Sequence, residues 1–215
     1  MTKIETFNQL NELLAKFVES KDFLDKFYRI YDIQPDMPLA ALHDQIFHFL
    51  SDEQFGYPVH LAREELMGWD VSRRTGAHAS SARRTAVQSY RVNVGNPFPG
   101  INYGKAHHCV DLIYIYDCFA DALRAADQAL PAGFVTNASL VETMQDDWIR
   151  FITAPSTGDQ YGLATIYNAD RTSSVIEMAS DKDWVERMAR FDLLDKNRTA
   201  AQQVIKALTG SGHTF

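Results

Sequence analysis

YRVNVGNPFPGINYGKAHHCVDL, residues 90–112, sets out a strand, a turn, a histidine-bearing loop and the start of a helix, in that order. Residues 90–94 alternate with a period of two and are rich in β-branched and aromatic types, which predicts a strand. The NPFPG sequence at residues 96–100 is a strong turn cluster, and residues 101–108 follow as a loop. A short apolar helix is expected over residues 111–123.

The sequence before this stretch predicts helices. Apolar residues recur at the spacing of one helical face over residues 4–17, and further helices are expected over residues 23–31, 39–50 and 51–66. Residues 68–89 are small, polar and basic, and are expected to form a long loop. Residues 1–67 are therefore interpreted as a helical segment.

The sequence after the histidine loop adds helices and two more strands. Helices are expected over residues 140–152 and 183–208, the second with a break near Lys196 and Asn197. Residues 162–167 and 174–178 predict two short strands joined by a turn. With residues 90–94 this makes about three strands, fewer than a closed α/β sheet needs. The predicted fold class is therefore α/β, helix-rich, with an incomplete sheet.

The composition is that of an ordinary globular protein, and the charge is acidic. The 215 residues carry a formal net charge of −7, with 46% hydrophobic and 23% charged residues. One domain, or a large part of one, is the starting expectation. An acidic chain without a concentrated basic patch is a poor partner for nucleic acid. The one basic cluster is interpreted as a solvated loop rather than an anion site: Arg73, Arg74, Arg83 and Arg84.

The sequence also bears on the compartment. No apolar run is long enough to span a bilayer, and no signal-peptide pattern follows Met1. As written, the chain is expected in the cytoplasm, and secretion stays open if residues precede Met1. Cys109 and Cys118 lie in one apolar run, where a helix would separate them by about 13 Å, too far for a disulfide. Two free thiols are typical of a reducing compartment.

The loop around His107 and His108 is the part of the sequence best suited to chemistry. A histidine on a loop just after a sheet strand is where α/β-hydrolases place their general base. An imidazole there takes the proton of a serine hydroxyl and returns it to the leaving alcohol. The residues alone leave open the alternative that such a histidine only bonds to loop backbone.

Two other uses of this loop are less favoured. His107, His108, Cys109 and Asp111 are metal-ligand types, but they stand too close together for a tetrahedral site without a second cluster, and none is evident. Cys109 beside His108 suggests a thiol and imidazole pair, yet adjacent residues rarely face each other, which favours a structural thiol. No metal ion is therefore expected.

Four motifs in order resemble the end of the type-B carboxylesterases, a family that includes cholinesterase-like and fungal esterases. A helix start of the Asp-x-x-Phe-x-x-Pro type stands at residues 52–58, and a Tyr-x-Val strand at residues 90–92. A His-x-x-Asp-Leu loop and helix stands at residues 108–112, and a Met-x-x-x-Trp-x-x-Phe helix at residues 144–151. The resemblance covers roughly residues 52–151 and points to the fungal branch.

The resemblance implies a fold and a role for each matched residue. The chain would be the C-terminal portion of an α/β-hydrolase fold, and His108, three positions before the acidic residue, would be the catalytic histidine. His107 is the near alternative, because adjacent side chains of an extended loop point to opposite sides and only one can face a nucleophile. Asp111 would be a structural carboxylate, and Trp148 and Phe151 would be core residues. The substrate would be a carboxylic ester, with no cofactor.

The earlier parts of this family's catalytic machinery are missing from the sequence. In α/β-hydrolases the triad runs Ser, then Asp or Glu, then His, and no Gly-x-Ser-x-Gly occurs here. The nearest string, Thr-Gly-Ser-Gly at residues 209–212, lacks the first glycine at the required spacing, and the family's oxyanion Gly-Gly motif is also absent. Glu5 is the only residue near the expected place of the triad acid, and its neighbours do not match the family.

Residues 1–215 are therefore interpreted as one partial α/β-hydrolase domain, with the strand, histidine loop and C-terminal elements at residues 90–215. Such a chain supplies the triad histidine without nucleophile or acid, and is expected to be inactive alone. Two alternatives stay open: a non-catalytic protein-interaction module, and a subunit that complements a separately encoded half. An incomplete sheet also predicts self-association through its exposed edge.

Overall fold

The computed structural model describes residues 4–74, 87–116, 118–153 and 162–210, including their side chains except over residues 67–74. The chain forms two compact units, the first made of residues 1–68 and 182–215 and the second of residues 69–181. The C-terminal helices thus belong with the N-terminal ones. Each unit buries an apolar cluster of its own.

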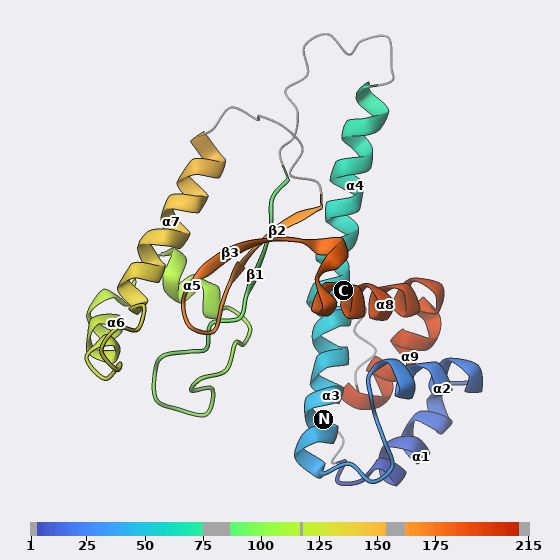
Figure 1. Ribbon diagram of the computed structural model, residues 1–215. Coiled ribbons are helices and arrows are strands. Elements are labelled where there is room, and N and C mark those ends of the chain that lie inside the picture. Colours follow the sequence, from blue (N-terminus) through green and yellow to red (C-terminus); the bar gives the residue numbers. More distant parts are fainter. Residues whose placement is uncertain (1–3, 75–86, 117, 154–161, 211–215) are drawn as a thin grey trace. The chain divides into compact units, whose positions relative to one another are not determined.

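Within the described residues of the first unit, the regular elements are all helices, joined by turns (Figure 1). Its helices are α1 (Phe7–Phe17), α2 (Lys21–Ile30), α3 (Leu39–Ser51), the π-helical turn η1 (Asp52–Gly56), the first part of α4 (Tyr57–Arg74), α8 (Lys182–Lys196) and α9 (Arg198–Thr209). Thr6 and Ser20 begin α1 and α2, because their side-chain oxygens accept the backbone N–H groups of Gln9 and Phe23. α1 packs against α9, and α2 against α8.

A buried carboxylate ties η1 to α8 inside the first unit. Asp52 is only 3% exposed and accepts a hydrogen bond from Arg190 Nε at 2.5 Å. Arg187 Nε lies 3.7 Å from the same carboxylate, and the Tyr31 hydroxyl lies 3.5 Å from it. Because a buried charge is tolerated only when it is paired, these contacts fix η1 against α8.

The second unit combines a small sheet with three helices. Its elements are β1 (Ser89–Val92), α5 (Val110–Ile115), α6 (Ala120–Asp127), α7 (Asn137–Thr153), β2 (Leu163–Tyr167), β3 (Ser173–Glu177) and the short 3₁₀ turn η2 (Met178–Ser180). The described strands lie in the order β1-β2-β3. β1 pairs parallel with β2, with Tyr90 opposite Thr165, and β2 pairs antiparallel with β3.

The three helices of the second unit lie together on one side of the strands (Figure 1). α5 and α6 both pack against α7. α7 meets the sheet through Asp147, whose Oδ2 accepts from the Tyr167 hydroxyl at 3.0 Å, and through Trp148, whose ring lies 5.9 Å from that of Tyr90. The buried side chains of this cluster are Val94, Val110, Ile113, Tyr114, Leu123, Leu140, Val141, Met144 and Tyr167.

The coarse prediction of the fold class is confirmed. The described residues are helix-rich with a three-stranded mixed sheet that does not close. The break expected near Lys196 is also present, since α8 ends there and α9 begins at Arg198. The predicted helix over residues 39–50 and the two predicted C-terminal strands match α3, β2 and β3 within two residues.

Two predictions of local structure are corrected. The helix expected over residues 111–123 is two helices, α5 and α6. Tyr114 and Leu123 both enter the same buried cluster, but nine residues of one continuous helix would place them on opposite faces. The loop expected from residue 68 is also wrong at its start, because α4 continues to Arg74. Residues 75–86, which include Arg83 and Arg84, lie outside the described residues.

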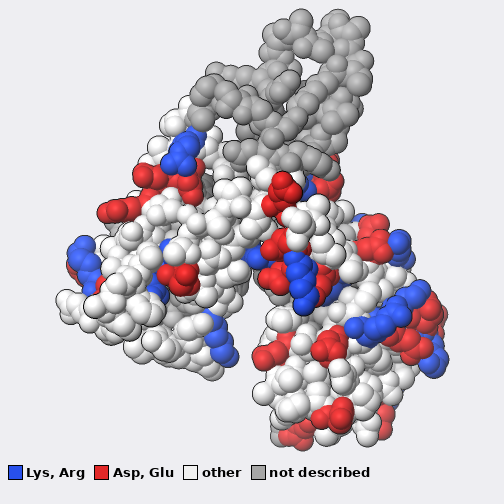
Figure 2. All heavy atoms as spheres, in the orientation of Figure 1, with Lys and Arg blue, Asp and Glu red and all other residues white. Residues whose placement is uncertain are grey.

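No helix in the described ranges is both long enough and apolar enough to cross a bilayer. On the face shown in Figure 2, the Lys and Arg side chains are interspersed with Asp and Glu. Such mixing lowers the local positive potential that phosphate binding needs.

Candidate functional site

The loop between β1 and α5 closes on itself at two glycines. A Cβ built on Gly95 would lie 2.8 Å from Gly104 Cα and closer still to the Gly104 carbonyl group. Gly104 has a φ of +71°, a conformation that side chains with a Cβ rarely adopt. The Gly95 position therefore has no room for a side chain, and the closure brings the two ends of the loop together.

Asn96 makes four hydrogen bonds, three of which join these two ends. Its backbone N–H donates to Lys105 O at 3.0 Å, and its carbonyl accepts from Gly104 N–H at 2.9 Å. Its side-chain Oδ1 accepts from Phe98 N–H at 2.8 Å, and its Nδ2 lies 3.0 Å from His107 Nε2. Asn96, the first residue of the turn predicted at residues 96–100, is thus also a hydrogen-bond partner of His107.

His107 is half-buried, and both of its ring nitrogens are engaged within the loop. Nε2 faces Asn96, and Nδ1 lies 2.7 Å from the carbonyl oxygen of His108. His108 itself is exposed. His108 is followed by Cys109, whose φ of +66° turns the chain into α5.

Asp111 in the first turn of α5 is bonded to the strand that precedes the loop. The Tyr90 hydroxyl donates to Asp111 Oδ2 at 3.2 Å. Burial, the neighbouring Asp111 carboxylate and Tyr116 raise the pKa of Tyr90 to about 12, so the phenol keeps its proton and remains a donor at neutral pH. The loop that carries the histidines is therefore tied at its strand end and at its helix end.

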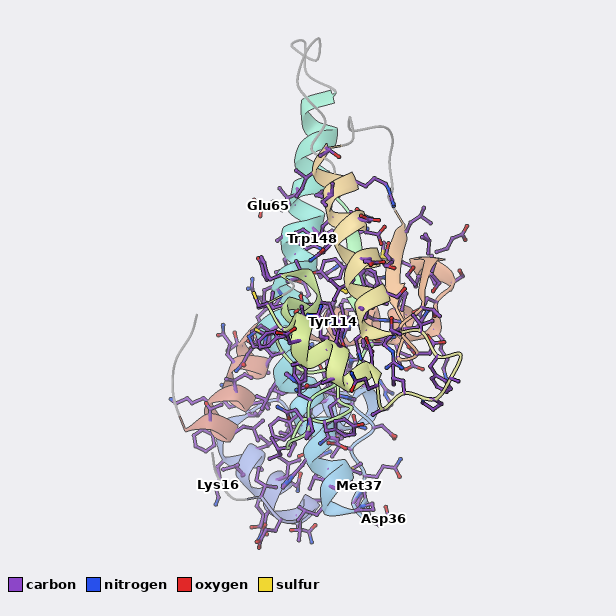
Figure 3. The ribbon with its side chains drawn as sticks, turned by 90° about the vertical axis from the view of Figure 1, so that its left-hand side faces the viewer. Lys16, Asp36, Met37, Glu65, Tyr114 and Trp148 are labelled. Atoms are coloured by element: carbon purple, nitrogen blue, oxygen red, sulfur yellow. The ribbon has the colours of Figure 1, made fainter. Side chains whose placement is uncertain are left out.

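A series of hydrogen bonds through Asp127, Asn137 and Tyr114 connects helices α6, α7 and α5 to the loop at Gly95. Asn137 is 1% exposed, and its backbone N–H and side-chain Nδ2 donate to Asp127 Oδ1 at 2.6 and 2.7 Å. The Tyr114 hydroxyl lies 3.3 Å from both Asn137 Oδ1 and Gly95 O. Figure 3 labels Tyr114 on α5, inside the second unit. Burial is the main reason that the pKa of Tyr114 rises to about 12.

The two residues predicted as core positions on α7 are not buried. Trp148 is 37% exposed and Phe151 is 38% exposed. α7 buries Leu140, Val141 and Met144 near its N-terminus, where α5 and α6 pack against it, whereas Trp148 and Phe151 lie in the later turns. The Trp148 ring still makes a T-shaped, edge-to-face contact with the Tyr90 ring.

The remaining candidates from the sequence lie apart from the loop in the chain. Glu5, the residue nearest to the expected triad acid, is exposed in the first unit, where its N–H donates to Gln9 Oε1. Of the string at residues 209–212, Gly210 ends α9 in the left-handed conformation, and residues 211–212 lie outside the described residues.

A metal centre finds no support in the described part of the chain, where no three His, Cys, Asp or Glu side chains gather at ligand distance. Cys109 and Cys118 are both exposed, free thiols. The geometry thus offers an exposed imidazole, that of His108, on a firmly bonded loop.

Three residues of the site were not found from the sequence. The sequence places Asn96 in a turn and Tyr114 in a helix, and Asn137 lies before the helix expected over residues 140–152. A polar residue at a helix N-terminus is an ordinary signal, but the contact of Asn96 with a ring eleven residues later depends on the closure at Gly95 and Gly104. Comparison of the chain with protein-family models, with curated proteins and with solved structures finds no match.

Proposed function

We propose that the chain is the C-terminal part of a type-B carboxylesterase with an α/β-hydrolase fold, and that His108 is the general base of ester hydrolysis. The substrate would be a small carboxylic ester, and the serine nucleophile and triad acid would come from a segment outside residues 1–215. The chain alone would be inactive, with no cofactor and no nucleic-acid partner.

The bond between Tyr90 and Asp111 is the observation that carries this proposal. Two of the four motifs of the resemblance place a strand tyrosine first, and then a histidine followed three residues later by an acidic residue. The hydroxyl of that tyrosine donates to that acidic residue at 3.2 Å, across the loop that holds His108. A carboxylate used in this way is structural, which agrees with the role that the resemblance implies for Asp111.

The choice of His108 over His107 follows from the loop bonds. His107 could accept a serine proton on Nε2 only by giving up its contact with Asn96. His108 is exposed on the same loop, and the contact from His107 Nδ1 engages its backbone carbonyl. In the proposed reaction, the His108 imidazole takes the serine proton as the serine oxygen attacks the ester carbonyl. It then gives that proton to the leaving alcohol, and water releases the acyl group in the same way.

The native transcript upstream of Met1 provides the test. We expect an in-frame segment with Gly-x-Ser-x-Gly and an acid, and we expect the extended protein to hydrolyse p-nitrophenyl butyrate. His108→Ala should then lower kcat by about 10³-fold or more. His48→Ala, at an exposed histidine of α3, is the matched control and should leave kcat unchanged. Rapid stoichiometric labelling of the 215-residue chain by a fluorophosphonate would contradict the proposal.

A second candidate is a non-catalytic interaction module, and the later turns of α7 favour it. Ile149 is 58% exposed and Ile152 is 71% exposed, on a helix that also exposes Trp148 and Phe151. Apolar side chains gathered in this way mark contact surfaces. For this candidate, His108→Ala would behave as the wild type in every assay, and the chain would be monodisperse.

The exposed edge of the sheet supports a proposal of self-association. β3 is an outer strand of the described sheet, and Val175 at its centre is 66% exposed. The proposed occupant is β3 of a second copy, since one edge strand can pair with another by backbone hydrogen bonds. For the chain as written, the two exposed free thiols favour a reducing compartment, and the cytoplasm remains the proposed location.

A further inference from the structure

The side-chain amide of Asn96 has only one orientation that satisfies its neighbours. Phe98 N–H, a donor, lies 2.8 Å from one end of the amide, which must therefore be the oxygen. The other end, 3.0 Å from His107 Nε2, must then be the NH₂ group. A donor facing Nε2 requires that this ring nitrogen carries a lone pair and no proton.

This requirement fixes the tautomer of His107. With a lone pair on Nε2, a neutral imidazole carries its proton on Nδ1. His107 Nδ1 lies 2.7 Å from the carbonyl oxygen of His108, an acceptor that needs such a proton. Both contacts of the ring are satisfied by the Nδ1–H tautomer, and by no other neutral form.

We propose that Asn96 is a positioning residue for His108 and acts through His107. The Asn96 amide selects the Nδ1–H tautomer of His107, and that N–H holds the backbone carbonyl of His108. The backbone of Asn96 is in turn fixed by Lys105 O and Gly104 N–H, and the preceding Gly95 O accepts from Tyr114. The effect of Asn96 on the His107 tautomer belongs to the loop alone, whereas the effect of Asn96 on catalysis rests on the proposed function.

The choice of an asparagine at this position then has a chemical reason. An aspartate would still accept from Phe98 N–H, but its second oxygen would face the Nε2 lone pair. Two facing lone pairs repel, so the His107 ring would take a proton on Nε2, which then donates to the carboxylate that the variant carries at position 96. The ring would be either the other neutral tautomer or the imidazolium. The neutral Nδ1–H form would be lost in both cases, although the backbone turn would keep its bond.

Nitrogen spectroscopy of the ring tests this proposal on the 215-residue chain itself. The chain carries [¹⁵N]histidine, and the spectra are recorded at a pH of about 8.5, two units above the ordinary histidine pKa. The wild type should show His107, assigned by its loss in His107→Gln, as the Nδ1–H tautomer. Asn96→Asp should move the His107 signals to a form protonated on Nε2. Asn102→Asp, the same change at an exposed residue of the same loop, should not.

Two results would overturn the proposal. The first is a wild-type His107 that carries its proton on Nε2, which needs no variant and therefore no assumption about folding. The second is an Asn96→Asp chain whose His107 signals are those of the wild type. In the extended enzyme, Asn96→Asp should lower kcat by about ten- to a hundred-fold with KM unchanged. If His108→Ala leaves hydrolysis intact there, the proposed function fails, and the tautomer result still stands.

Discussion

Gly95 and Gly104 lie so close that a Cβ on the first would stand 2.8 Å from the Cα of the second. Eight residues separate them in the chain, and the loop between contains the turn at residues 96–100. Their contact brings Asn96 within reach of His107, and it depends on the absence of a side chain at residue 95. A single methyl group is therefore the most direct probe of the loop.

Gly95→Ala should open this loop. The added methyl meets backbone atoms that no rotamer change can move, so we expect a local loss of about 3 kcal/mol. Hydrogen exchange of the Asn96 and Gly104 amides, both bonded in the loop, measures this loss. Gly133→Ala is the control: its φ is +88° but no atom lies within 4 Å of the new Cβ, so only about 1 kcal/mol of backbone strain is expected. Equal protection of the loop amides in both variants would contradict the prediction.

Four phenols should make the chain sensitive to alkaline pH. Burial raises the pKa of Tyr28, Tyr57, Tyr90 and Tyr114 from 10.0 to about 12. An unfolded chain loses these protons near pH 10, whereas the folded chain holds them to about pH 12. Stability from this source is therefore complete below pH 10 and is lost as the pH rises through 12.

Tyrosinate absorbance, followed during an alkaline titration, checks this expectation. Tyr90→Phe should remove one tyrosine from the step near pH 12, because its hydroxyl then no longer exists beside Asp111. An unchanged step in this variant would show that Tyr90 does not contribute to it.

The sequence was informative where a local signal decides the structure. The break between α8 and α9 was predicted at Lys196 and Asn197, where the Asn197 side chain donates to Leu193 O and the helix ends. The strand, turn and loop order around His108 was predicted in the same way. By contrast, the division into α5 and α6 depends on Tyr114 and Leu123 entering one cluster, which is a tertiary effect.

The site was predictable only in part, for the same reason. The residues at 107 and 108 could be singled out by type and position, whereas the structural role of Asp111 is implied only by the resemblance and stays a prediction. The contacts of Asn96 with His107, and of Tyr114 with Gly95, join residues that share no period or motif. The core position of Trp148 was expected from the resemblance, whereas α7 buries Leu140, Val141 and Met144 in its earlier turns and leaves Trp148 37% exposed.

Asp52→Ala should destabilise the first unit. The substitution removes the buried carboxylate that pairs with Arg190 and accepts from the Tyr31 hydroxyl. Breaking a buried ion pair lowers the free energy of unfolding by about 3 kcal/mol, because the arginine charge loses its partner. Urea unfolding followed by helical circular dichroism measures the loss. Asp25→Ala is the control, because the Asp25 pair with Lys21 is exposed, and should cost about 0.5 kcal/mol or less. Equal midpoints for the two variants would contradict a stabilising role of Asp52.

Val175→Lys should weaken self-association through the sheet edge. A lysine at the centre of β3 places a charge where a second copy of the strand would lie, and charged residues are the usual protection of an edge. Sedimentation velocity at increasing concentration should show the wild type forming dimers and Val175→Lys remaining monomeric. Val185→Lys makes the same change at a valine that is 52% exposed but belongs to the helix α8 rather than to a strand, and should associate as the wild type does. If the two variants behave alike, the contact between copies does not use β3, and the apolar turns of α7 become the surface to alter next.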